Sequence, residues 1–123
     1  MNYRLIIIEN SLKDKSILKN YTILSKTYFE RGTPAESVMY KVEIPDNQVE
    51  LISERLKNTL IPPYYCHLYQ ENPEEDTLIV IFKDTVFKAR KSNYTEAFNY
   101  GVSHGVTKEQ MRIEPTEVQK ERW

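Results

Sequence analysis

Short apolar runs and alternating segments dominate the chain and predict more strand than helix. Tyr3 to Glu9 contains four apolar residues in succession, too few for a helix and apolar on both faces, which predicts a central strand. Residues 21–30 and 36–44 alternate in part between apolar and polar side chains. Between them, Gly32 and Pro34 interrupt regular structure, so the two segments predict a β-hairpin with a loop of several residues.

Three more segments predict a second group of strands, at residues 64–70, 77–83 and 84–90. The acidic stretch ENPEED separates the first two, and the three together predict a meander. The middle segment contains Leu78 to Phe82, which is apolar at every position. Such a strand is buried on both faces, so we expect helices on one face and a partner sheet, a subunit or a ligand on the other.

The first helix is predicted between residues 46 and 60. Apolar residues recur there at spacings of three, four and four and leave charged residues on the other face. Asp46 is the predicted N-cap, and Pro62 and Pro63 stop the helix because proline cannot continue it. The four apolar positions are Val49, Ile52, Leu56 and Leu60.

The second helix is predicted to run from an N-cap at Asn93 to a C-terminal cap at Gly105. Gly101 lies on its apolar face, where the missing side chain lets the helix approach a sheet closely. A further short helix or turn is expected to start at Thr107, which forms a capping box with Gln110.

These elements predict an α+β fold in two layers. We expect a mostly antiparallel sheet of about five or six strands, with the helices at 46–60 and 93–105 packed on one face. The whole chain, residues 1–123, is predicted to form a single domain, in which residues from approximately 112 to 123 are a peripheral C-terminal tail.

Composition and charge fit a small folded domain. With 40% hydrophobic and 28% charged residues, the 123 residues can bury one core. The 17 Lys and Arg residues against 18 Asp and Glu residues give a net charge of −1, which provides no general field for nucleic acid or anionic membranes. A single cysteine excludes an intramolecular disulfide, and no apolar run approaches the ~20 residues that span a bilayer. We therefore predict a cytoplasmic protein with no membrane partner.

The stretch PPYYCHLYQE contains the only cysteine and one of the two histidines. In an extended strand Cys66 and His67 point to opposite faces, whereas a nucleophile needs its base within roughly 2.6 to 3.2 Å. His104 on the second helix is then the remaining base for Cys66. Two interpretations stay open: a small enzyme that uses His67, Cys66 or His104, and a buried Cys66 that acts as a small hydrophobe.

The same alternation places Tyr65, His67 and Tyr69 in a row on one face. This row predicts a ligand-binding surface, because polar-tipped rings can line a pocket or stack on a ligand, and it fits equally well beneath a helix. The chain has none of the usual phosphate, dinucleotide, metalloprotease, hydrolase or redox motifs, and its histidines and cysteine have no metal-ligand spacing. We predict no catalytic residue from a motif, no cofactor and no metal.

A local basic group at Lys88, Arg90 and Lys91 is the candidate for binding single-stranded nucleic acid. Lys and Arg beside aromatic side chains are typical of sheets that bind single strands. The alternative is that these charges lie on an outer strand, where they discourage edge-to-edge aggregation.

The sequence alone does not assign a function. We expect a non-enzymatic interaction or ligand-binding module that self-associates as a homo-oligomer through its sheet and binds an unknown protein or small-molecule partner. A small enzyme and a single-stranded nucleic-acid binder with a basic and aromatic sheet face are the alternatives.

Overall fold

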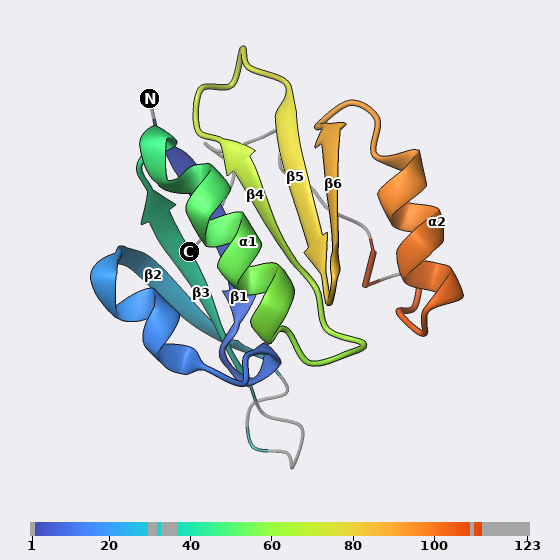
Figure 1. Cartoon of the computed structure of the whole chain (residues 1–123), viewed down its shortest axis with the longest axis horizontal. Helices are drawn as coiled ribbons and strands as arrows, with labels where there is room; N and C mark the ends of the chain where they lie inside the picture. Colours follow the sequence, from blue (N-terminus) through green and yellow to red (C-terminus); the bar gives the residue numbers. More distant parts are fainter. Residues whose placement is uncertain (1, 30–31, 33–36, 109, 112–123) are drawn as a thin grey trace.

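One six-stranded antiparallel sheet organises the chain in the computed structural model, which describes residues 2–29, 32, 37–108, 110 and 111 (Figure 1). The strand order is β2-β3-β1-β4-β5-β6. The strands are β1 (Tyr3–Ile8), β2 (Thr22–Phe29), β3 (Ser37–Ile44), β4 (Cys66–Gln70), β5 (Thr77–Phe82) and β6 (Thr85–Arg90). The α-helices are α1 (Val49–Thr59) and α2 (Thr95–Ser103), and three short 3-10 segments are η1 (Glu9–Ser11), η2 (Lys15–Asn20) and η3 (Asp46–Gln48).

The predicted α+β class, the antiparallel sheet and its strand number are confirmed. β2 and β3 form the predicted hairpin, and β4, β5 and β6 form the predicted meander. β1 lies between β3 and β4, and Leu5 is opposite both Val42 and Leu68. The apolar run of β1 is therefore central, as its sequence predicts.

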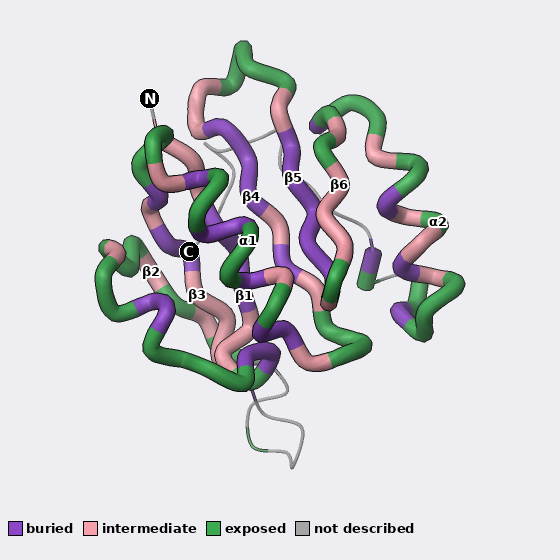
Figure 2. Tube along the Cα trace, in the orientation of Figure 1, coloured by how far each residue is buried: buried purple, intermediate pink, exposed green. Residues whose placement is uncertain are grey.

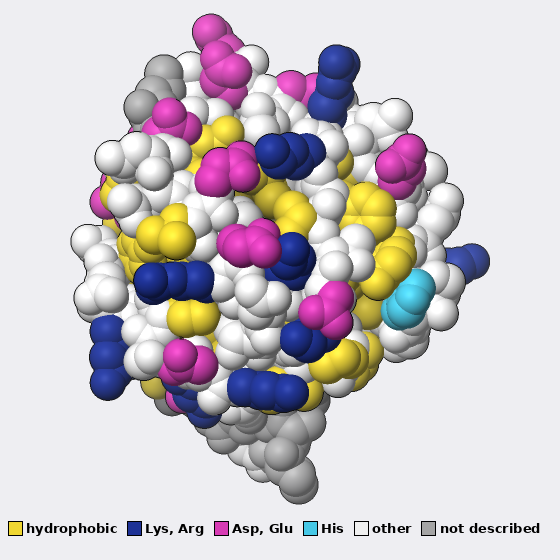
Figure 3. Space-filling model, in the orientation of Figure 1, with side chains coloured by type: hydrophobic (Ala, Val, Ile, Leu, Met, Phe, Trp, Pro, Cys, Tyr) yellow, Lys and Arg dark blue, Asp and Glu magenta, His cyan; other side chains and the backbone are white. Residues whose placement is uncertain are grey.

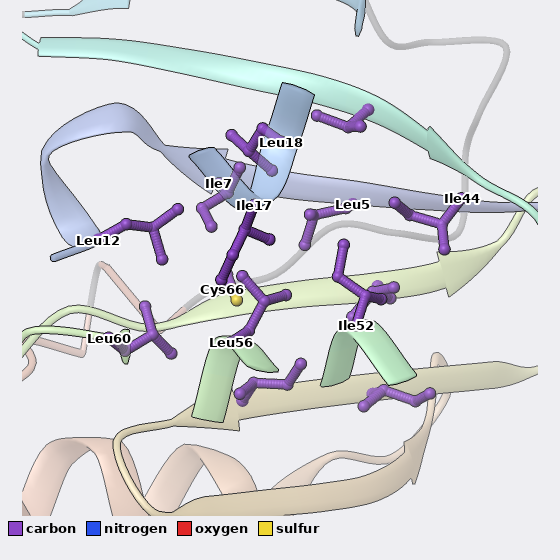
Figure 4. Close-up of a cluster of buried hydrophobic side chains, with 14 of the residues drawn as sticks. Leu5, Ile7, Leu12, Ile17, Leu18, Ile44, Ile52, Leu56, Leu60 and Cys66 are labelled. Atoms are coloured by element: carbon purple, nitrogen blue, oxygen red, sulfur yellow. The ribbon is translucent and has the colours of Figure 1, made fainter. Parts of the chain in front are cut away.

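The larger core lies between the sheet and α1. Ile52 and Leu56 of α1 are fully buried against sheet residues such as Leu5 and Leu68. Figure 4 shows this cluster, with the sulfur of Cys66 among leucine and isoleucine side chains. Burial of each such aliphatic side chain stabilises the fold by about 1.5–3 kcal/mol, so this interface fixes α1 on the sheet.

The second helix packs on the opposite face, so the prediction that both helices cover one face is wrong. Along β5, Ile79 and Ile81 belong to the α1 core, whereas Leu78, Val80 and Phe82 belong to a second cluster. That cluster includes Ala97, Val106 and Met111 from α2 and the segment after it. The periodicity of a helix shows which of its own faces is apolar but not which face of the sheet receives it.

β5 is consequently buried on both faces by its own chain. Leu78, Val80 and Ile81 have no exposed surface, and Phe82 is buried as well. Figure 2 shows β4 and β5 as mostly buried and β6 as intermediate to exposed. The expected cover of one β5 face by a partner sheet, a subunit or a ligand is thus supplied by α2 and the residues after it.

The helix ends agree with the sequence at the C-terminal side. Gly105 has a φ of +100°, and the amides of Gly105 and Val106 donate to the carbonyls of Val102 and Gly101, which is a Schellman cap. Thr107 and Gln110 form the predicted capping box in both directions, at 3.2 and 3.1 Å.

The predicted N-caps differ in outcome. Asp46 is wrong as the N-cap of the first helix, because it starts η3 and α1 begins only at Val49. The N-cap position of α2 is Tyr94 and not Asn93, so that prediction is displaced by one residue. The Asn93 side chain still accepts hydrogen bonds from the amide and hydroxyl of Thr95, at 3.2 and 2.7 Å, and so orders the turn into α2.

Gly101 makes a close approach possible, but the partner is not the sheet. A Cβ atom placed on Gly101 would lie 2.4 Å from the Sδ atom of Met111, whose side chain is fully buried. Met111 therefore folds back onto α2 at the one helical position that has no side chain, and this contact fastens the segment after α2.

We predict that Gly101→Ala lowers the free energy of unfolding by about 1–2 kcal/mol, because the new methyl group displaces Met111 from a packed position. In a Met111→Ala background the same substitution should instead raise stability by about 0.5–1 kcal/mol through helix propensity. Urea unfolding of the two single variants and the double variant gives the coupling. Additive effects of the two substitutions would contradict this contact.

Candidate functional site

The predicted aromatic row exists on the α2 face of the sheet. The ring centroids of Tyr65 and His67 are 6.5 Å apart, and those of His67 and Tyr69 are 6.2 Å apart, both with near-parallel planes. Tyr65 also contacts Phe82, which belongs to the second core cluster. The row is therefore continuous with the packing under α2.

The polar tips of the row differ in their partners. The hydroxyl of Tyr65 donates to the carbonyl of Gln110. The hydroxyl of Tyr69 is buried and has no hydrogen-bond partner within the described part of the chain. The Nζ atom of Lys91 lies 5.8 Å from the centroid of the Tyr69 ring, a cation–π arrangement. Burial raises the pKa of the Tyr65 hydroxyl and lowers the pKa of the His67 imidazole to about 4.

The structure does not bring Cys66 and His67 together. Cys66 is buried in the α1 core, and burial raises the pKa of its thiol, which keeps it protonated at neutral pH. His67 belongs to the opposite face, as the alternation predicts. His104 is exposed at the end of α2, where its ring stacks on Tyr100 at 3.9 Å. A buried thiol without a base on its own side is not an activated nucleophile.

The basic candidates are likewise dispersed. The register of β6 places Lys88 and Arg90 on the α1 face with Val86, away from the row of Tyr65 to Tyr69. Lys88 forms an exposed ion pair with Glu50 at 3.1 Å. A single face that is both basic and aromatic is therefore not assembled.

Lys91 is a structural side chain, since it is 5% exposed. Its Nζ atom donates to the carbonyls of Gln70 and Asn72, at 2.7 and 3.2 Å, and closes the loop between β4 and β5. Burial lowers the pKa of this ammonium group, while Asp76 and Glu75 oppose that effect.

Among the residues that the structure describes, no group of three or more His, Cys, Asp and Glu side chains could hold a metal ion. None of the described helices is long and apolar enough to cross a membrane.

A cleft of about 710 Å³ lies between β6 and the start of α2, and no sequence pattern identified it. Phe87 and Ala89 line one wall, and Tyr94 and Ala97 line the other. Figure 3 shows hydrophobic side chains gathered at the surface between these two elements. Its volume falls in the range of about 300–1,000 Å³ that is usual for ligand sites.

The loop between β6 and α2, which contributes Ser92 and Asn93 to the cleft, is held by hydrogen bonds to Asp76 and Arg90. Asp76 accepts hydrogen bonds from the amide and hydroxyl of Ser92, at 3.0 and 2.5 Å. These bonds lower the pKa of the Asp76 carboxyl group. Arg90 and Asn93 exchange backbone hydrogen bonds at 3.2 and 3.1 Å. The loop is thereby fixed relative to β6.

The open wall of the cleft is a sheet edge. β6 is the last strand, and a two-residue turn joins Phe82 to Thr85, so Thr85, Phe87 and Ala89 direct their backbone groups toward β5. Val86 and Lys88 direct theirs outward, and no hydrogen bond among the described residues uses those groups. The cleft therefore lies beside an unpaired stretch of strand edge, of which Lys88 belongs to its lining.

Comparison of the chain with models of protein families, with curated proteins and with solved structures gave no match. A function for this protein is therefore proposed from the geometry of the site.

We predict that Tyr69→Phe raises the free energy of unfolding by about 1 kcal/mol, because it removes a buried hydroxyl that has no partner. The matched variant Tyr65→Phe should lower it by about 1 kcal/mol, because that hydroxyl is hydrogen-bonded to Gln110. Urea denaturation at neutral pH measures both. Destabilisation by Tyr69→Phe would show that its hydroxyl has a partner in solution.

The lowered pKa of His67 also predicts a pH dependence. The unfolded side chain takes up a proton near its ordinary pKa of 6.5, whereas the folded one does so only near 4. The contribution of neutral His67 to the free energy of unfolding is therefore fully present above about pH 6.5. It is lost progressively as the pH falls toward 4, by about 2–3 kcal/mol. Denaturation of wild type and His67→Gln at pH 7 and pH 4.5 should show a smaller loss in the variant. His104→Gln is the control and should keep the wild-type loss. Equal losses in all three proteins would contradict the lowered pKa of His67.

Proposed function

We propose that this chain is a non-enzymatic binding module whose ligand site is the cleft between β6 and α2. The observation that carries the proposal is the outward-facing backbone of Val86 and Lys88, unpaired beside a cleft lined by both polar and apolar side chains. Unpaired strand edges are usually covered or protected, and this one is left open next to a fixed wall.

The dispersal of the reactive side chains supports a binding role over an enzymatic one. Cys66 is enclosed by aliphatic side chains, His67 is on the opposite face and the His104 ring is held against Tyr100. General acid–base or nucleophilic catalysis needs such groups within hydrogen-bond reach of one another. The cleft itself is lined by neither histidine nor cysteine.

The row of Tyr65, His67 and Tyr69 supports the cleft from behind in this proposal. Tyr65 contacts Phe82, whose ring lies 5.9 Å from that of Phe87 in an edge-to-face arrangement. Phe87 in turn lines the cleft. The row thus fixes the position of the cleft wall without touching the ligand.

A second part of the proposal is that the protein is cytoplasmic and self-associates at β2, the other edge of the sheet. The single buried thiol suits a reducing compartment. On β2, Ile23, Leu24 and Tyr28 are 45%, 43% and 40% exposed, a concentration of apolar surface on an edge strand.

We expect Ile23→Lys with Leu24→Lys to convert a dimer into a monomer in sedimentation velocity experiments, because lysines on an edge oppose strand pairing. The control Leu51→Lys removes an exposed leucine from α1 instead and should leave the dimer intact. A wild-type protein that is monomeric at high concentration would overturn self-association and leave the cleft proposal unaffected.

The cleft proposal is tested by NMR screening of short peptides and small aromatic compounds. Chemical-shift changes should concentrate in residues 86–97 and disappear in Ala89→Tyr, whose side chain fills the cleft. The control Thr22→Tyr adds the same ring to an exposed position on β2 and should keep the changes. A screen in which no compound perturbs residues 86–97 would overturn the proposal, and so would changes that persist in Ala89→Tyr.

A further inference from the structure

We infer that the cleft binds an extended peptide as a seventh strand on β6, with acidic side chains on the α1 face and apolar side chains on the α2 face. The inference rests on the proposed function and specifies the ligand. A strand edge with free backbone groups is a template for another strand, and addition of an extended peptide to such an edge is a general mode of recognition.

The register of β6 determines where the ladder runs. Outward N–H and C=O groups of Val86 and Lys88 provide four hydrogen bonds for a neighbouring strand. At one end the ladder stops at Arg90, whose outward groups already pair with Asn93. At the other end Tyr100 approaches the start of β6 through its hydroxyl, 3.2 Å from that of Thr85. The available edge fits a segment of about five residues.

The α1 face of this edge is basic. Val86, Lys88 and Arg90 point to that face, so two of three neighbours of an added strand are cations. Lys88 has a partner in Glu50, but the two side chains are 70% and 81% exposed and the pair is weak. Acidic side chains on the incoming strand would lie directly across from these cations, where opposite charges stabilise strand pairs.

The α2 face of the same edge presents apolar side chains, with polar groups such as Thr95 and Glu96 also lining the cleft. Phe87 and Ala89 point to that face, and Tyr94 and Ala97 form the far wall of the cleft. An incoming strand places alternate side chains on this side, where valine-sized or aromatic groups would cover the wall. The side chains of the incoming peptide alternate between the two faces whether it runs parallel or antiparallel to β6. The expected pattern of alternating acidic and apolar residues is therefore the same for both directions.

The same charges disfavour a second copy of this chain as the occupant. Pairing of β6 with β6 of another molecule would gather Lys88 and Arg90 of both copies on one face, and like charges across strands are destabilising. A partner with alternating acidic residues has no such penalty. The β6 edge therefore favours an acidic partner over a second copy of this chain.

Titration with defined peptides tests the inference by NMR. A blocked hexapeptide of alternating glutamate and valine should bind at residues 86–97, and the lysine–valine analogue should bind at least about tenfold more weakly. Reversal of the charges with Lys88→Glu and Arg90→Glu should exchange that preference. Equal affinities for the two peptides, or binding of both at β2, would overturn the inference.

Backbone pairing is tested separately with N-methylated peptides. In an added strand, only every second peptide amide faces β6. N-methylation should therefore abolish binding at one residue type, glutamate or valine, and be tolerated at the other. Loss at glutamate indicates an antiparallel strand and loss at valine a parallel one. Equal effects of the two methylation patterns would show that the peptide does not join the sheet.

Variants of Lys88 provide the matched control on the protein. Lys88→Pro removes the outward N–H and should reduce affinity at least about tenfold, whereas Lys88→Gln removes only the charge and should reduce it a few-fold. Circular dichroism verifies that both variants are folded. If Lys88→Pro and Lys88→Gln bind the peptide with equal affinity, the peptide does not form backbone hydrogen bonds with β6.

The two proposals fail in different ways. Compounds that perturb residues 86–97 while the glutamate–valine peptide does not bind would overturn the peptide inference and leave the binding module intact. If neither the screen nor the peptide perturbs these residues, both proposals fall.

Discussion

Burial of β5 on both faces is the constraint on which the rest of the structure depends. A strand whose residues Leu78 to Phe82 are all apolar is stable only if water is excluded from two sides at once. α1 supplies one cover, and α2 with Val106 and Met111 supplies the other. The helices therefore lie on opposite faces, and the Met111 contact with Gly101 fastens the second cover in place.

That arrangement also creates the candidate site. α2 follows β6 directly, so in covering the face of β5 it lies beside the last strand of the sheet without pairing to it (Figure 1). The outer backbone of β6 remains open, and the loop held by Asp76 and Asn93 closes one end of the space. The cleft is thus a consequence of how the core is covered, and the rings of Tyr65, Phe82 and Phe87 connect it to that core.

The sequence predicts those features that local patterns determine. Alternation separates Cys66 from His67 correctly, the apolar runs locate β1 and β5, and glycine at residue 105 marks the end of α2. The sheet face that each helix covers depends on tertiary packing, as does the partner of Gly101, and neither is encoded in periodicity. The cleft was missed for the same reason: Lys88 and Arg90 suggest an edge strand, but only the strand order and the position of α2 show that the edge lines a cavity.

Amide hydrogen exchange along β6, followed by NMR, tests most directly whether this edge is open. The account predicts an alternation in which the amides of Phe87 and Ala89 are protected by bonds to β5. The amides of Val86 and Lys88 should exchange about a hundredfold faster or more, because they point outward without a partner. Protection of Val86 and Lys88 equal to that of Phe87 and Ala89 would show that the edge is already occupied and would contradict the account.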